Sequence, residues 1–126
     1  MAQGNYSHIE IPADNVDRAV GFYKSVFGWK FETIPGFEGY ELYQTAAGRE
    51  GIGGGIGKRG QTAGKEIRNY IDVDSVDAAV TKVKQHGGKV VLPKAEVMGQ
   101  GWYAVVTDTE GNEFAVWEND PNARRG

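Results

Sequence analysis

The sequence predicts an α+β domain made of two βαβββ modules, whose mixed sheet curves around a central cavity and carries helices on its outer face. Two observations predict this fold: an internal repeat at an offset of about sixty residues, and 19 glycines in 126 residues. Glycine is thus about twice as frequent as the usual ~7%, which indicates many tight connections. The expected modules span about 5–60 and 66–120 of a single domain, and residues 121–126 form a tail.

The repeat rests on three pairs of segments that match in one register. They are His8-Ile9-Glu10-Ile11 with Tyr70-Ile71-Asp72-Val73, Val16-Asp17-Arg18-Ala19-Val20 with Val76-Asp77-Ala78-Ala79-Val80, and Gly28-Trp29-Lys30-Phe31 with Gly87-Gly88-Lys89-Val90. Three matches in register are not expected by chance, so the chain contains a duplicated structural unit.

Each module is expected to begin with an alternating strand and to continue into an amphipathic helix. Asp14 or Asn15 is the predicted N-cap of the first helix, and Asp74 or Ser75 that of the second. Gly28 and Gly87 are expected to end the two helices. The predicted buried stripe of the first helix is Val16, Ala19, Val20, Tyr23 and Phe27.

Three further strands are expected in each module, separated by turn residues. In the first module they span about 29–34, 39–45 and 51–58, with breaks at Pro35-Gly36 and Ala47-Gly48. In the second they span about 88–92, 102–108 and 113–118. The last strand of the first module contains a glycine run over 51–57, which we interpret as a strand with little side-chain bulk.

The alternation of side chains divides the strand residues between two faces. The apolar set, which includes Ile9, Ile11, Phe114 and Val116, is expected to pack under the helices. The opposite set should line the cavity, together with either Trp102 or Tyr103. Its members are His8, Glu10, Tyr70, Asp72, Glu113, Ala115 and Trp117.

Composition narrows the classes of partner. A formal net charge of −3 provides no basic surface for nucleic acid, and the absence of cysteine excludes disulfides and thiolate metal sites. No apolar run reaches the roughly 20 residues that span a bilayer. The first residues lack the charged and apolar regions of a signal peptide. We therefore expect a cytoplasmic protein without a membrane partner.

The motifs resemble those of the vicinal oxygen chelate superfamily, which includes glyoxalase I, bleomycin-resistance proteins and extradiol dioxygenases. The segments that carry the resemblance are His8-Ile9-Glu10-Ile11-Pro12-Ala13-Asp14, the stretch from Ala19 to Gly28 that is similar to the family's FYxxxLG signature, and Asp108-Thr109-Glu110-Gly111-Asn112-Glu113-Phe114. The resemblance implies paired βαβββ modules over nearly the whole chain. The most similar branch is the small, uncharacterised glyoxalase-related proteins.

The resemblance also implies where the family's metal ligands would lie. The four positions correspond to His8, Gly54, Tyr70 and Ala115, so only the first keeps the family's histidine. Because a divalent metal needs three or four donors, we expect no metal cofactor. A divalent ion held at His8 is the alternative.

Two roles are open for the residues of the inner face. His8, Glu10 and Asp72 are candidate catalytic groups, since a histidine or two converging carboxylates can act in acid–base chemistry; each of them can equally be a satisfied structural residue. Tyr70, Trp117, Ala115, Gly54 and Glu113 are candidates for lining a ligand site, the aromatic ones by stacking.

The function predicted from these residues is the binding of a small molecule by a metal-independent homodimer of the glyoxalase/bleomycin-resistance type. The first alternative is an enzyme of the same superfamily, a lyase, isomerase or dioxygenase, with a rearranged site of histidine and carboxylates. The second is a structural or interaction module without catalytic activity, whose cavity is filled by its own aromatic side chains.

Overall fold

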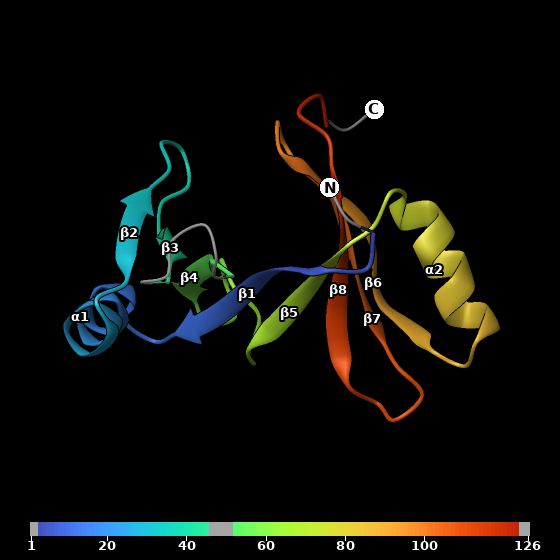
Figure 1. Ribbon diagram of the computed structural model, residues 1–126, viewed down its shortest axis with the longest axis horizontal. Helices are drawn as coiled ribbons and strands as arrows, with labels where there is room; N and C mark the ends of the chain where they lie inside the picture. Colours follow the sequence, from blue (N-terminus) through green and yellow to red (C-terminus); the bar gives the residue numbers. More distant parts are fainter. Residues whose placement is uncertain (1–2, 46–51, 124–126) are drawn as a thin grey trace. The chain divides into compact units, whose positions relative to one another are not determined.

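The computed structural model describes residues 3–45 and 52–123 (Figure 1). The chain divides into two compact units, the first comprising Ser7–Asn69 and the second Met1–Tyr6 with Tyr70–Gly126. The predicted turn at Ala47-Gly48, the start of the predicted strand at 51 and the end of the predicted tail lie outside the described residues.

The first unit is a four-stranded mixed sheet with one helix. Its strand order is β2-β3-β4-β1, in which β1 runs parallel to β4 and the other neighbours are antiparallel. The elements follow the chain as β1 (Tyr6–Ala13), α1 (Val16–Phe27), β2 (Lys30–Thr33), β3 (Tyr40–Gln44) and β4 (Gly54–Lys58).

The second unit repeats this topology. Its strand order is β5-β8-β7-β6, again with one parallel pair, β5 with β8, and antiparallel neighbours elsewhere. The elements are β5 (Arg68–Asp72), α2 (Val76–Gln85), β6 (Lys89–Val97), β7 (Gly101–Thr107) and β8 (Glu113–Asn119). The predicted α+β fold with duplicated βαβββ modules is confirmed. The central cavity expected from the face pattern stays a prediction.

Both helices begin at one of the two residues predicted to cap them. The side chain of Asn15 accepts a hydrogen bond from the Arg18 N–H at 2.9 Å, and that of Ser75 from the Ala78 N–H at 3.1 Å. These bonds satisfy N–H groups that have no partner within the helix. Gly28 ends α1 with φ of 72°, a left-handed conformation that glycine adopts without steric cost.

The faces of the two sheets divide as the alternation predicts. Ile11 and Ile56 are buried against α1, and Val116 is buried against α2. On the opposite face of the second unit, Tyr70 and Ala115 are buried with Val105, and the partly buried Tyr103 and Trp117 pack against them. Tyr103 rather than Trp102 therefore shares a face with Trp117, while Trp102 packs on the helix side.

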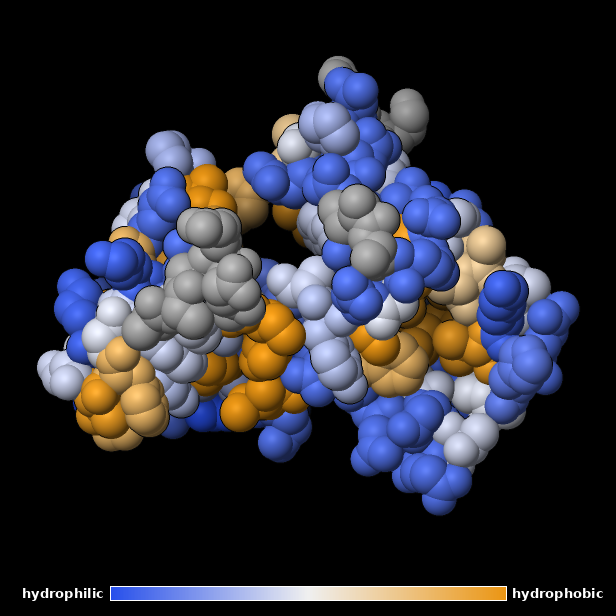
Figure 2. Space-filling model, in the orientation of Figure 1, coloured by the Kyte–Doolittle hydropathy of each residue, from blue (hydrophilic) through white to orange (hydrophobic). Residues whose placement is uncertain are grey.

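The prediction that Phe27 is buried in the stripe of α1 was wrong. Its side chain is 53% exposed, and its ring lies against Tyr23 and Trp29 at the end of the helix. Phe27 is the last residue of α1, and Gly28 turns the chain directly after it. Phe22 and Val26 are also exposed, and Figure 2 shows hydrophobic residues gathered over α1.

Strand β6 is longer than the predicted 88–92, because it continues through Pro93 to Val97. A proline would interrupt a central strand, since it has no N–H to donate. Here β6 is the last strand in the order of its unit, and its pairing with β7 shifts register between Val90 and Leu92 and again between Leu92 and Ala95. The extra strand length is therefore compatible with the proline.

The buried position of Ile56 predicts a large loss of stability on truncation. Ile56 has no exposed surface, so Ile56→Ala should lower the free energy of unfolding by about 2–5 kcal/mol. Urea unfolding would measure this loss. Ile67→Ala is the matched control, because Ile67 is 60% exposed and should change stability by about 0.5 kcal/mol or less. Equal losses in the two variants would refute the assignment of faces.

Candidate functional site

A histidine and a tyrosine from two strands of the first unit meet on the face opposite α1. The Nε2 atom of His8 lies 2.9 Å from the Tyr40 hydroxyl oxygen, within hydrogen-bond distance. His8 comes from β1 and Tyr40 from the first position of β3, and both are half-buried. The parity of β1 places His8 and Glu10 on this face, since Ile9 and Ile11 pack toward the helix.

Glycines of β4 provide the space that Tyr40 occupies. A Cβ atom at Gly55 would collide with the Tyr40 hydroxyl, and one at Gly57 would lie 2.9 Å from Cδ1 of the same ring. Gly55 is also the register partner of Glu10 on β1. We call the surface formed by His8, Glu10, Tyr40, Gly55 and Gly57 the His8 face. Strand β4 contributes only main-chain atoms to this face at Gly55 and Gly57, and the side chains of the face come from the neighbouring strands β1 and β3.

Glu10 is a buried carboxylate with a cationic neighbour in the same unit. Its side chain is 9% exposed, and Oε1 lies 3.9 Å from Nη1 of Arg68, whose side chain is 20% exposed. Arg68 is the first residue of β5 but belongs to the first unit. The long separation makes this a charge contact rather than a hydrogen bond. The His8 face therefore has one basic group at its border.

Burial determines the charge of His8. Removal from water penalises the imidazolium and lowers the pKa of His8 from 6.5 to about 4. At neutral pH the imidazole is therefore uncharged, with one ring nitrogen as donor and the other as acceptor. The His8 face thus presents a neutral hydrogen-bonding pair beside a buried ion pair.

The second unit has an aromatic surface on its corresponding face. The rings of Tyr70 and Tyr103 are 6.2 Å apart, and Trp117 packs against the same cluster. Gly101 accommodates the Trp117 ring, because a Cβ atom at Gly101 would lie 2.6 Å from Cζ2. The packing of the Trp117 ring over Gly101 resembles that of the Tyr40 ring over Gly55 in the first unit.

Two further predicted residues, Asp72 and Glu113, border the aromatic cluster of the second unit, and Asp72 is the register partner of Trp117. Glu113 is exposed at the start of β8, although it shares the parity of Ala115. Asp72 is buried, and its main-chain groups bond to Gly4 and Asn5. A catalytic pairing of Asp72 with Glu10 stays a prediction.

The positions implied for a metal centre do not supply enough donors. Ala115 has no polar side-chain atom, and a Cβ atom at Gly54 would overlap the carbonyl oxygen of Ile9. No liganding side chain therefore fits at Gly54, which leaves His8 and Tyr70 as the donors of the set. Among residues 3–45 and 52–123, no group of three histidine or carboxylate side chains is placed to hold a metal ion. The absence of a full metal site stays a prediction.

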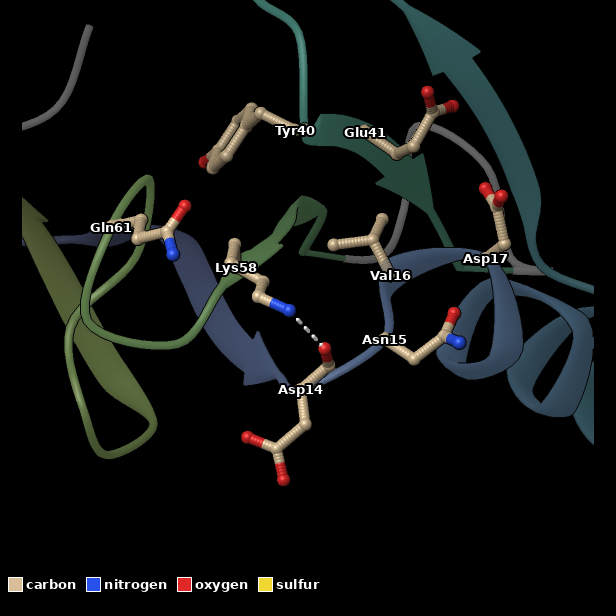
Figure 3. Close-up of a pocket in the computed structure, with 9 residues that line it drawn as sticks. Asp14, Asn15, Val16, Asp17, Tyr40, Glu41, Lys58 and Gln61 are labelled. Carbon is tan, nitrogen blue, oxygen red and sulfur yellow. Dashed lines mark hydrogen bonds between the residues drawn. The ribbon is translucent and has the colours of Figure 1, made fainter.

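A polar pocket of about 470 Å³ lies at the start of α1 in the first unit (Figure 3). Lys58 extends across it and donates a hydrogen bond to the main-chain oxygen of Asp14, while the Asp14 carboxylate points away and pairs with Arg59 at 2.9 Å. Tyr40 lines this pocket as well as the His8 face. Two of its charged lining residues, Asp14 and Asp17, are exposed, so it is a weaker candidate for a ligand site.

Comparison with known proteins identifies the family. The sequence model of the Glyoxalase/Bleomycin resistance protein/Dioxygenase superfamily matches residues 5–116. The chain belongs to this superfamily. The predicted resemblance is therefore confirmed, and the duplicated βαβββ fold agrees with it.

Individual relatives show the same relationship. A glyoxylase-like domain-containing protein of Didymella fabae is 34% identical over 92% of this chain and 94% of the relative. A putative glyoxylase of Mycobacterium bovis is 28% identical over 92% of this chain, which spans only 46% of that relative. A superfamily member from Vibrio splendidus has a similar structure, with a TM-score of 0.68 at 12% identity, covering 92% of this chain and all of that one.

Two residues of the site were missed by sequence reasoning. Arg68 has the parity of Tyr70 and Asp72, so extending that strand by two residues would have placed it on the inner face. The sequence signal for Tyr40 was weaker. Tyr40 is an aromatic residue at the start of β3, which pairs with the glycine-rich strand β4. Aromatic rings commonly cover such glycines.

The contact between Tyr40 and Gly55 predicts a coupled pair of mutations. Gly55→Ala should destabilise the protein by about 1–3 kcal/mol, because the methyl group displaces Tyr40. In a Tyr40→Ala background the same change should cost at least about 1 kcal/mol less. Gly21→Ala is the control, since nothing lies near that position in α1 and alanine there should stabilise the helix by about 0.5–1 kcal/mol. Additive losses in denaturant unfolding would contradict the contact.

The lowered pKa of His8 predicts a specific dependence of stability on pH. The unfolded chain takes up the proton near pH 6.5 and the folded chain only near pH 4. The titration of His8 should therefore not lower the free energy of unfolding above pH 6.5. As the pH falls from 6.5 to 4, it should lower this free energy progressively, by up to about 3 kcal/mol. His8→Gln should flatten this part of the profile. NMR titration should show the His8 ring changing near pH 4, with His86→Gln to assign the signals; a midpoint near 6.5 would contradict it.

Proposed function

We propose that this protein binds a small organic molecule on the His8 face without a metal ion. The observation that supports this proposal is the hydrogen-bonded pair that the neutral His8 and the Tyr40 hydroxyl form on the face opposite α1. A few placed polar groups are typical of small-molecule sites.

The properties of His8 favour binding over catalysis. A general base works best when its pKa is near the working pH, whereas the pKa of His8 is lowered to about 4. At pH 7 the imidazole is a weak base, so it is better suited to orient a ligand by hydrogen bonding than to remove a proton. The enzymatic alternative with His8, Glu10 and Asp72 as catalytic groups is therefore not preferred.

The donor set supports a site without metal. Only two of the four implied ligand positions have a polar side chain, and Gly54 has no room for one. The homodimer and the cytoplasmic location expected from the sequence stay predictions. Within the described ranges, no helix is both long and apolar enough to cross a membrane.

A fragment screen by ligand-observed NMR in the presence of EDTA tests the proposal. Hits should bind under these conditions, and Tyr40→Phe and His8→Ala should each weaken them by about 0.5–1.5 kcal/mol, the net value of one hydrogen bond. Thr33→Ala is the control; its hydroxyl binds Glu41 on an exposed part of β2 and β3, so affinity should change by no more than a few tenths of a kcal/mol.

Three outcomes would contradict the proposal. Hits that ignore both His8 and Tyr40 but depend on Trp117 would move the site to the aromatic surface of the second unit. Binding that requires about one equivalent of zinc, nickel, iron or manganese, measured by elemental analysis, would restore the metal-dependent alternative. A screen without hits would favour the structural or interaction module.

A further inference from the structure

Arg68 has hydrogen-bonding capacity that its own unit does not use. A guanidinium group carries five N–H donors, yet Arg68 contacts Glu10 only at 3.9 Å, and its side chain makes no hydrogen bond among the residues that the structure describes. At 20% exposure the group is largely removed from water. Donors in such a place are costly unless they find an acceptor.

The local backbone keeps space for this guanidinium. A Cβ atom at Gly64 would lie 2.7 Å from Nη2 of Arg68. The segment before β5 therefore passes close to the charged end of the side chain. Gly64 allows the arginine to lie beside Glu10 without being pushed into solvent.

The position of Arg68 relates it to the His8 face. Arg68 lies beside Glu10, and Glu10 is two residues from His8 on the same side of β1. Two residues along a strand span roughly 7 Å. A molecule the size of a substituted aromatic acid could therefore contact Arg68 at one end and His8 with Tyr40 at the other.

We propose that the ligand of this face is a small monocarboxylic acid, whose carboxylate receives hydrogen bonds from the guanidinium of Arg68. This inference rests on the proposed function. Planar carboxylates match the fork of arginine donors. A phosphate dianion would be less suitable, because the buried carboxylate of Glu10 repels the second negative charge. Glu10 thus holds Arg68 in place and also limits the charge of the ligand.

Matched probes test the assignment. Phenylacetate and phenylacetamide have nearly the same shape but differ in charge, and phenyl phosphate tests the dianion. By titration calorimetry at pH 7, the unaltered protein should bind phenylacetate about 10-fold or more tightly than phenylacetamide, the range expected for a charge-assisted hydrogen bond. Phenyl phosphate should bind more weakly than phenylacetate.

Variants of the ion pair should act in opposite directions. Arg68→Met should remove the preference for phenylacetate, and Arg68→Lys should keep part of it. Glu10→Gln should strengthen phenylacetate binding several-fold, because a competing carboxylate is neutralised. A merely structural ion pair would instead weaken binding in both variants. Arg18→Met is the control, since it removes the same charge from an exposed position of α1 and should preserve the preference.

The outcomes separate this inference from the proposed function. Equal affinity for phenylacetate and phenylacetamide, both dependent on His8 and Tyr40, would overturn the carboxylate assignment while leaving the binding site in place. A preference that survives Arg68→Met, or tighter binding of phenyl phosphate, would also overturn it. If Arg68→Met does not fold, the same test compares the Arg68→Met/Glu10→Gln double variant with the Glu10→Gln variant. The double variant should then lose the preference for phenylacetate over phenylacetamide, and a preference that survives in it would overturn the assignment. Absence of binding by all three probes would overturn the inference, and the fragment screen then decides the function.

Discussion

The close approach of backbone and aromatic rings over strand β4 is the constraint on which the first unit depends. Between Gly54 and Gly57 only Ile56 carries a side chain, and it fills the core under α1. The three glycines have no room for a Cβ atom, since Ile9, Tyr40 and Thr62 occupy that space. The four residues Gly54–Gly57 thus contribute one apolar side chain, Ile56, to the core under α1. The side chains on the opposite face come from the neighbouring strands.

The same constraint applies to Gly54, one of the four positions that the family resemblance implies for a metal ligand. Close contact with β1 at Gly54 excludes any liganding side chain there. A side chain at Gly54 would therefore require the parallel strands β1 and β4 to move apart. On the opposite face of β1, His8 is hydrogen-bonded to the Tyr40 hydroxyl.

Much of the fold was predictable from the sequence because its signals are local and repeated. Asn15, Ser75 and Gly28 have caps or turns that depend on neighbouring residues alone. The face of each strand followed from alternation, which also placed His8 on the face opposite Ile11. Predictions failed where tertiary context decides: the Phe27 side chain is exposed at the end of α1, and β6 continues through Pro93 because an edge strand tolerates it. The contacts of Tyr40 and Arg68 join residues more than thirty positions apart, and no local pattern specifies such pairs.

The irregular pairing of β6 also has a consequence for the behaviour of the protein in concentrated solution. An outer strand with the exposed side chains Val91 and Leu92 has the composition of a template on which further chains could assemble into fibrils. Pro93 removes one main-chain donor from that template, the two register shifts break its periodicity, and Lys94 adds a charge. Proline, irregular register and charge are features by which edge strands avoid self-association.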